Sequence, residues 1–414
     1  MFGASTDRNF IRRLIAIALA ALSLRICIRL STGVQDYWTQ GYSQYAALAQ
    51  SLCAGNGYAF ADHLPTAFRV PLYSYFVAAA TCGAGSPWPL IIVQSLLSSA
   101  TAVLAGLIAR RMAGNGAGLV AAALYAVWPY AAWHDLSLQE SGLHAFLAAL
   151  ATWLLVRLRD GQGKGLALAS GVVLGAMLLT RATMLPFALS ALVIVALPFR
   201  GTTRVGGAII AGLAMLAVLS PWLAYSHRVT GAYGLGTEGG SALFAGNHRL
   251  TFSSYPERSI DESRANVFAS LGPQENEELA RLGHDEVAQS DWFQAHALRN
   301  IAADPVGFTT GAMRKLWAAF GPFPTPRHGL IGNLGYAAFW VPLFGLALAG
   351  MAIRRKLWRD DLLLHAHTLT FCLMTALFWA QTSHRSYLDP YLAAFAGAAL
   401  ITILPLRARN WLES

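Results

Sequence analysis

The sequence predicts an all-α polytopic membrane protein built around about ten membrane-spanning helices. Of its 414 residues, 55% are hydrophobic and only 12% are charged. Soluble proteins of this size carry a larger share of charged residues, so the composition favours a membrane protein. Apolar runs of about 20 residues recur along the chain, and each is long enough to cross about 30 Å of hydrocarbon.

Ten apolar runs define the expected spans. The first begins after Arg12 and Arg13 and ends near Leu30. It is too long for the core of a signal peptide and no small-residue cleavage site follows it, so we expect a retained helix. The predicted spans are 11–30, 88–108, 114–132, 141–157, 165–180, 183–199, 205–225, 331–352, 362–380 and 389–406.

Basic residues predict the orientation of these spans. The net charge is +9, which taken alone suggests a polyanion partner. If the chain crosses ten times, however, its basic loops and termini fall on one side, which is the positive-inside pattern. We therefore expect orientation charges, no nucleic acid partner, and both termini in the cytoplasm of a bacterial cell. The residues are Arg8, Arg12, Arg13, Arg110, Arg111, Arg157, Arg159, Lys164, Arg200, Arg204, Arg354, Arg355, Lys356, Arg359, Arg407 and Arg409.

Two long loops then face outward, and they divide the chain into three parts. An N-terminal transmembrane module (1–225) contains the first outer loop (31–87). An extracytoplasmic domain (226–330) follows, and then the C-terminal transmembrane helices (331–414).

Each outer loop is expected to contain helices. In the first loop, "SQYAALAQSL" has helical periodicity, and "RVPLYSYFVAAA" predicts a short helix lying in the membrane interface. In the second, "PQENEELARLGHDEVAQSDWFQAHALRNIAADP" predicts two solvated amphipathic helices. Their inward residues are expected to be Trp292, Phe293, Ala297 and Leu298.

The four cysteines are scattered and form no metal-binding CxxC pattern. Cys53 and Cys82 both fall on the outer side, where a disulfide is compatible with their positions. The simpler interpretation is that these two, with Cys27 and Cys372, are small packing residues.

Polar residues accumulate at the outer membrane surface, which predicts a site that opens outward. Glu140 lies at the start of a span, where an ionisable side chain is costly and usually functional. The alternative is that it only stabilises the helix N-terminus. Asp135 is a second candidate carboxylate. The full outer set is Asp36, Arg69, His134, Asp135, Glu140, Arg181, Glu238, Asn247, His384, Arg385 and Asp389.

Three arginines are candidate phosphate ligands. Arg181 interrupts an otherwise apolar run, and a guanidinium at the membrane face suits bidentate binding of a phosphate. Snorkelling to lipid head groups explains it equally well. Arg69 and Arg385 allow the same two interpretations. The chain has no HExxH, GxSxG, P-loop or zinc-spaced cluster, so neither ATP nor a cofactor is predicted.

Five stretches in order resemble a known family over residues 35–405. They are "YAALAQSLCAGNGY" followed by "RVPLY", the acid Glu140 at the start of a span, "GAMLLTRATMLP", "LSPWLAYSHRVTGAYGLGTEGGSALFAGNH" and "HRSYLDPYLAAFAG". Together they are similar to the integral-membrane glycosyltransferases of the GT-C superfamily. Within it, the bacterial branch that resembles protein mannosyltransferases and lipid A aminoarabinose transferases is the nearest.

The resemblance implies an activity and a set of roles. It implies transfer of one sugar from a polyprenyl-phosphate donor to an acceptor at the outer face, the acceptor being a glycolipid, lipid A or core, a polysaccharide or a protein. Carboxylates take a proton or stabilise the sugar cation, and arginines hold the leaving phosphate. Its implied roles are catalysis for Asp36, Glu140 and Asp135, donor phosphate binding for Arg69, Arg181 and Arg385, and substrate binding for Tyr45 and Asn247.

One position departs from the family pattern. The family acid lies four residues before the tyrosine, and here Gly41 occupies that place before Tyr45. Either Asp36 supplies the base from a shifted position, or the acceptor is already an anion, or the protein is inactive. Two functions from other classes stay open: a non-catalytic relative that binds a polyprenyl lipid, and a lipid or glycan transporter. Neither two-fold repetition nor mid-span charge favours the transporter.

Overall fold

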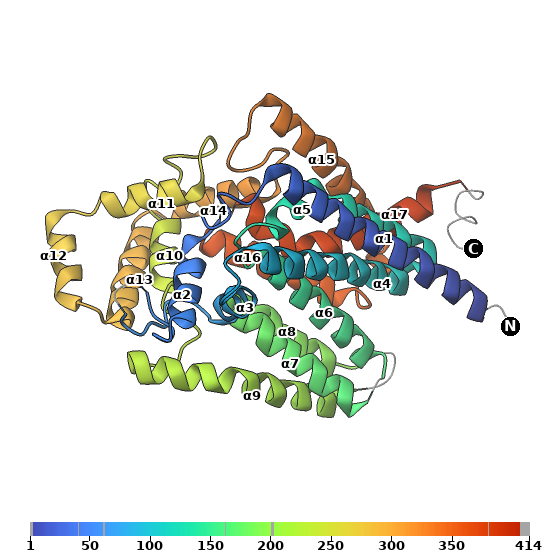
Figure 1. Ribbon diagram of the computed structural model, residues 1–414, viewed down its shortest axis with the longest axis horizontal. Helices are drawn as coiled ribbons and strands as arrows, with labels where there is room; N and C mark the ends of the chain where they lie inside the picture. The colour runs from blue at the N-terminus through green and yellow to red at the C-terminus, as the bar shows by residue number, and fades with distance from the viewer. Residues whose placement is uncertain are drawn as a thin grey trace.

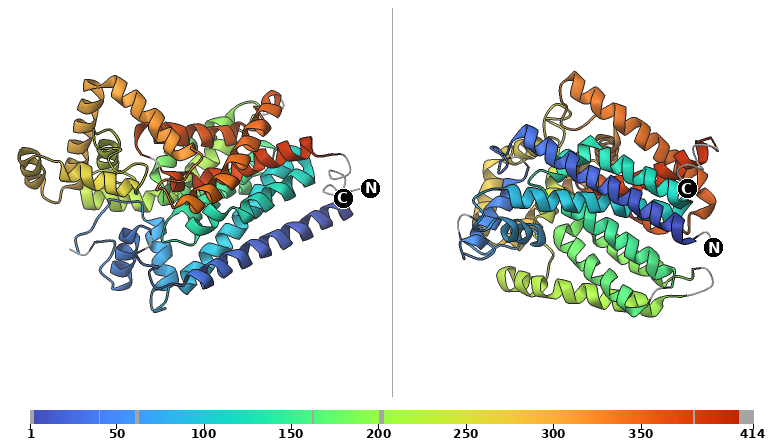
Figure 2. Two further views of the ribbon diagram at one scale, coloured as in Figure 1. Left: turned by 90° about the horizontal axis from the view of Figure 1, so that it is seen from above. Right: turned by 45° about the vertical axis from the view of Figure 1, so that its right-hand side comes forward.

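The computed structural model describes residues 3–39, 41–60, 63–161, 163–199, 203–379 and 381–405. These residues are mainly α-helical, and their only β-structure is two isolated bridges, of which Gly41–Leu138 bears on the site. The N-terminal end of α1 and the C-terminal end of α17 lie at one end of the molecule, and α11–α13 lie at the other (Figure 1). Figure 2 shows the long helices running between these two ends.

Helices occupy most of each of the ten predicted ranges within the described residues. Six described helices are long and apolar enough to cross a membrane: α1, α4, α6, α9, α15 and the α17 segment with its preceding turn. Shorter apolar helices occupy the other predicted ranges. The bounds are α1 Gly3–Thr32, α4 Trp88–Val127, α6 Ser141–Arg159, α7 Lys164–Thr180, α8 Leu185–Ala196, α9 Val205–Thr230, α15 Leu330–Ile353, α16 Leu362–Leu377 and α17 Asp389–Ile403.

The 40-residue helix α4 is a hairpin of two helical halves, as the separate predictions 88–108 and 114–132 require. Its backbone is non-helical at Ala113 and Gly114, where φ is +89° at the glycine. A Cβ on Gly106 would lie 3.0 Å from the carbonyl oxygen of Gly118. A straight helix would hold these two residues about 18 Å apart, so the chain reverses at Gly114 and the halves pack through small residues.

Helix α17 lies in the middle of the bundle, and nearly all of its side chains are buried. Glycines allow close packing on both sides of it. A Cβ on Gly397 would lie 2.6 Å from the carbonyl oxygen of Ala117, and one on Gly350 would meet Phe395. Backbones approach this closely only where side chains are small.

The basic turns gather at one end of the bundle. Arg111 makes a bidentate pair with Asp160, with N–O distances of 2.8 and 2.7 Å. Arg354 makes another with Asp361 at 2.7 and 2.8 Å and also donates to the carbonyl of Met112. Turns distant in sequence therefore meet at this end of the bundle. Arg200, Arg407 and Arg409 lie outside the described residues.

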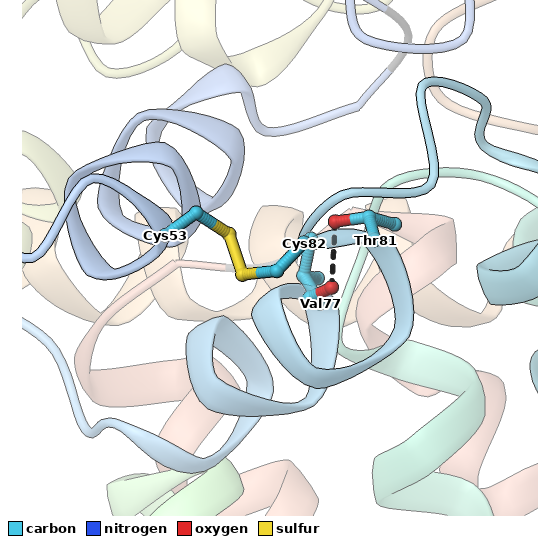
Figure 3. The surroundings of a disulfide bond; sticks show 4 residues. All are labelled: Cys53, Val77, Thr81 and Cys82. Carbon is cyan, nitrogen blue, oxygen red and sulfur yellow. Dashed lines mark hydrogen bonds between the residues drawn. A yellow bond between two sulfur atoms is a disulfide. The ribbon is translucent and has the colours of Figure 1, made fainter.

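The opposite end of the bundle carries the first outer loop. Its helices are α2 (Ser43–Cys53) and α3 (Leu72–Thr81), at the places where the sequence predicts helices. A disulfide between Cys53 and Cys82 joins the end of α2 to the end of α3 (Figure 3). For these two cysteines the packing interpretation is therefore wrong, whereas Cys27 and Cys372 are free.

Five helices follow α9 at the same end: α10 (Gly239–Gly246), α11 (Ile260–Ala269), α12 (Pro273–Leu282), α13 (Glu286–Ala303) and α14 (Pro305–Phe320). The two predicted amphipathic helices correspond to α12 and α13. Ala297 is buried as expected, but the predicted inward position of Leu298 is wrong, since that side chain is 52% exposed. Phe293 and Ala297 are four residues apart and share a face, and the next residue points about 100° away from it.

Candidate functional site

The centre of the candidate site is a carboxylate–guanidinium pair at the end of the bundle opposite the basic turns. Glu140 is the residue before α6 and Arg181 the residue after α7. These helices are antiparallel neighbours, so the start of one meets the end of the other, and Nη2 of Arg181 lies 3.9 Å from Oε1 of Glu140. The two side chains are 8% and 16% exposed. Helix α6 has 19 residues, so it separates this pair from the basic turns by about 28 Å.

The Glu140–Arg181 pair is incompletely satisfied. Within the described part of the chain, Oε2 of Glu140 and Nη1 of Arg181 are buried and have no hydrogen-bond partner. A buried polar atom without a partner costs about 1–3 kcal/mol. Such atoms cluster where a ligand or ordered water completes the set. No three His, Cys, Asp or Glu side chains group as metal ligands among the residues that the structure describes.

Gly41, which replaces the family acid, is fixed by a backbone contact two residues before Glu140. It forms a parallel bridge with Leu138, and the N–H of Tyr42 donates to the carbonyl of Leu138 at 3.0 Å. Its φ is +95°, and an added Cβ would lie 2.5 Å from that same carbonyl oxygen. No side chain fits this backbone, so the departure from the family pattern has a structural basis.

Arg69 approaches the site from the segment that precedes α3. Its guanidinium lies over the rings of Tyr42 and Tyr45, 5.3 and 5.2 Å from their centroids, and donates to Glu238 at 2.8 Å. Burial lowers the pKa of Arg69, but the nearby Tyr45 and Glu238 outweigh it and the net shift is upward. Its Nε is buried without a hydrogen-bond partner in the described residues.

Glu238 receives a second cation that the sequence did not suggest. Arg264 of α11 donates to the same Oε1 at 3.1 Å. Burial raises the pKa of Glu238, yet Arg69 and then Arg264 lower it by more, so it is ionised at neutral pH. In the sequence, Arg264 falls within the long second loop, where nothing distinguishes it from the other charged residues.

Tyr45 and Tyr42 form the aromatic wall of the site. Tyr45 is 4% exposed and packs edge-on against Tyr73 at 4.8 Å. Burial, and then the charge of Glu140, raise its pKa well above the usual value. The hydroxyl of Tyr42 lies 3.1 Å from Nε2 of His384. Both rings therefore lie within the electrostatic field of Glu140, Arg69 and Arg181.

Asp135 lies in a separate buried network. It ends α5 (Pro129–Asp135) and is fully buried. The hydroxyl of Ser98 donates to its Oδ2, and Nη2 of Arg25 lies 3.6 Å from the same atom. Burial raises the pKa of Asp135, with Arg25 and Ser98 opposing the shift. Its contacts thus connect α5 to α1 and α4. The sequence did not point to Arg25, because the apolar run around it indicates only a membrane-spanning helix.

Arg385 is fully buried and all its nitrogens are engaged. It donates to Asp389 at 3.3 Å, to the carbonyl of Ala319 at 2.5 Å and to the hydroxyl of Tyr336 at 3.0 Å. Its guanidinium also lies 3.4 Å from the ring centroid of Trp340. These contacts connect α14, α15 and α17, so each nitrogen of the guanidinium already has a partner within the protein.

Asn247 and Asp36 also lie apart from the Glu140–Arg181 pair. The amide of Asn247 donates to the carbonyls of Leu243 and Leu377 at 2.8 and 2.7 Å, and its oxygen accepts from Lys315. Asp36 is exposed in the turn that follows α1, and only its backbone carbonyl has a hydrogen-bond partner among the described residues, Thr39. The structure therefore brings together Glu140, Arg181, Arg69 and Tyr45 from the predicted set.

Comparison with known proteins adds a family match and a fold match. Residues 67–225 match a family model described as dolichyl-phosphate-mannose-protein mannosyltransferase. No curated protein matches the chain. The oligosaccharyltransferase of Archaeoglobus fulgidus in its apo form has a TM-score of 0.54 at 12% identity, covering 95% of this chain and 50% of that one. Its complex with an inhibitory peptide and a dolichol-phosphate has a TM-score of 0.50, also at 12% identity, with coverage of 95% and 50%. ArnT from Cupriavidus metallidurans bound to undecaprenyl phosphate has a TM-score of 0.40 at 13% identity, covering 95% and 78%.

The likeness to the oligosaccharyltransferase shows the fold. The chain spans about half the length of the oligosaccharyltransferase that it matches. The expected GT-C fold is confirmed, and the protein is a multi-pass membrane protein. The family match includes Glu140 and Arg181 and excludes Asp36. A fold does not determine an activity, so the residues of the site carry the functional information.

Proposed function

We propose that this protein is a glycosyltransferase that moves one sugar from a polyprenyl-phosphate donor to an acceptor at the outer face of the bacterial cell membrane. The observation that carries the proposal is the Glu140–Arg181 pair, with its unpartnered oxygen and nitrogen, at the end of the bundle remote from the basic turns. When a sugar leaves a phosphate, positive charge develops on the sugar ring and negative charge on the phosphate. A carboxylate can stabilise the first charge and a guanidinium the second.

In the proposed reaction, Arg181 holds the phosphate of the donor. The bond between the sugar carbon and the phosphate oxygen breaks, and its electron pair stays on the phosphate. An acceptor hydroxyl forms the new bond to the sugar carbon, and its proton passes to Glu140. Negative charge therefore grows next to Arg181 while Glu140 loses its own, so the pair stabilises both changes. Arg69 carries a second positive charge near the site, balanced by Glu238.

The proposed orientation has two supports. The basic turns lie at the end opposite the site, as expected for the cytoplasmic side. The Cys53–Cys82 disulfide lies in the first outer loop, and disulfides persist in oxidising compartments such as the periplasm. A site at that face meets a lipid-linked sugar rather than a nucleotide sugar.

The test is sugar transfer in membranes containing Glu140→Gln. This change keeps the shape of the side chain and removes its ability to take a proton, so we expect at least 100-fold slower transfer. Glu262→Gln is the matched control and should retain activity, because Glu262 is 47% exposed and pairs with the exposed Arg258. Unchanged transfer by Glu140→Gln would exclude the proposed mechanism. Mass spectrometry of envelope glycans after gene deletion would identify the sugar and the acceptor.

A second function is favoured by the backbone at Gly41. If the acid missing there is indispensable, the protein is a non-catalytic relative that binds a polyprenyl phosphate. Purified protein would then bind the lipid with the same dependence on Arg181 and transfer no sugar to any acceptor offered.

A further inference from the structure

We propose that His144 is a further donor-binding residue, which contacts both the phosphate and the sugar of the lipid-linked donor. This inference rests on the proposed function and extends it to a side chain for which the sequence predicts no role. His144 lies in α6, one turn after Glu140, and its N–H donates to the carbonyl of Glu140 at 2.8 Å. Residues four apart share a helix face, so the imidazole lies on the same side of α6 as Glu140.

His144 is fully buried, and neither ring nitrogen has a hydrogen-bond partner in the part of the chain that the structure describes. Burying an imidazole without partners is unfavourable, because both nitrogens lose the hydrogen bonds they make to water. Leu or Phe would fill this volume at no such cost. The described part of the protein therefore lacks the group that would complete the hydrogen bonds of the imidazole.

The surroundings of His144 indicate what that group is. Its ring packs edge-on against Tyr387 with the centroids 4.9 Å apart, and the guanidinium of Arg181 lies 6.0 Å from the centroid of the same tyrosine. Four unpartnered polar atoms thus belong to three neighbouring residues, Glu140, His144 and Arg181.

Another buried histidine of this bundle has polar partners on one side of its ring. His367 of α16 is equally buried and its Nδ1 also lacks a hydrogen-bond partner among the described residues, but its Nε2 lies 2.9 Å from Oγ1 of Thr152 and 3.0 Å from the hydroxyl of Tyr391. Its ring also stacks on Phe187 at 3.4 Å. His144 has no comparable polar contacts, so packing does not explain its presence.

The chemistry of a neutral imidazole defines the ligand. One nitrogen donates a hydrogen bond and the other accepts one, so the ligand presents an acceptor and a donor side by side. A phosphate oxygen next to a sugar hydroxyl provides both. The phosphate oxygen accepts from His144 while Arg181 pairs with its charge. Throughout the transfer His144 keeps its proton, since the proton of the acceptor passes to Glu140 and the leaving phosphate receives only the electron pair.

The test compares His144→Phe with His144→Gln in the full-length purified protein. Phe keeps the volume and removes both polar atoms, so we expect an unchanged or higher Tm together with at least 10-fold weaker binding of a mannosyl polyprenyl phosphate. Gln retains a donor and an acceptor and should restore part of the binding. His367→Phe is the matched control and should lower Tm, because Thr152 and Tyr391 each lose their hydrogen bond to Nε2 and keep only the one between their hydroxyls.

The outcomes separate this inference from the proposed function. Unchanged donor binding by His144→Phe would overturn the role of His144, and so would a fall in Tm that accompanies the loss of binding. If the donor binds in a His144-dependent manner but no acceptor receives the sugar, the transferase proposal fails and the binding role stands. If the unmodified protein binds neither mannosyl nor bare polyprenyl phosphate, both fail.

Discussion

Replacing Gly41 by Ala tests whether the backbone at this position excludes any side chain, including the acid found there in the family that the sequence resembles. Two costs are expected. A non-glycine residue at φ +95° is strained by about 1–3 kcal/mol. In addition, the new Cβ would lie 2.5 Å from the carbonyl oxygen of Leu138, and overpacking against a fixed backbone costs about 1–3 kcal/mol. Gly41→Ala should therefore lower the free energy of unfolding by about 2–6 kcal/mol.

Gly57→Ala is the matched control for backbone strain. Its φ is +79° and nothing lies within 4 Å of an added Cβ, so only the cost of about 1–3 kcal/mol applies. Both variants are compared by denaturant unfolding in one detergent, with sugar transfer measured alongside. Gly41→Ala should also lose activity, because the Leu138 contact lies two residues before Glu140. Equal stabilities for the two variants would refute the steric argument, and Gly41→Asp shares the same Cβ and should gain no activity.

Two further predictions concern the neighbourhood of the site. Burial lowers the pKa of His134 to about 4 despite a hydrogen bond with Gln139. Between pH 6.5 and 4 only the unfolded state then protonates this histidine, so the protein should lose about 3 kcal/mol of stability to it, measured as a falling Tm. Burial lowers the pKa of His384 to about 3, so His134→Gln should reduce the slope without abolishing it, and an unchanged slope would contradict the assignment. Arg385→Lys should lower the free energy of unfolding by about 3 kcal/mol or more, because a single ammonium cannot replace three directed donors at a buried site. Arg181→Lys should instead reduce sugar transfer and leave Tm nearly unchanged. The reverse pattern would assign Arg385 to donor binding and Arg181 to the fold.

Local signals predicted most of the fold. Hydropathy located the spans because a membrane helix must be apolar along its whole length, and Gly114 falls in the gap between two predicted spans that α4 joins as a hairpin. The predicted basic turns meet in ion pairs such as Arg111–Asp160. Leu298 was misplaced because a short amphipathic pattern does not define the edge of its buried face.

The site was less predictable because its contacts join residues far apart in sequence. Glu140 and Arg181 stood out as charges at the ends of spans, and they are neighbours. Asp135 and Arg385 gave the same signal, yet their partners, Arg25 and Tyr336, lie in other helices and cannot be paired from sequence. His144 gave no signal at all, since a histidine in an apolar helix is normally a satisfied core residue.

The Cys53–Cys82 bond has a practical consequence for measuring topology. It consumes two of the four cysteines, and the remaining thiols are Cys27 and Cys372. Replacing those two by alanine yields a chain without a reactive thiol while the outer loop stays cross-linked. Single reporter cysteines introduced near Lys356 or Glu278 can then be alkylated by a reagent that does not penetrate lipid, which assigns each end of the bundle to its compartment in intact cells.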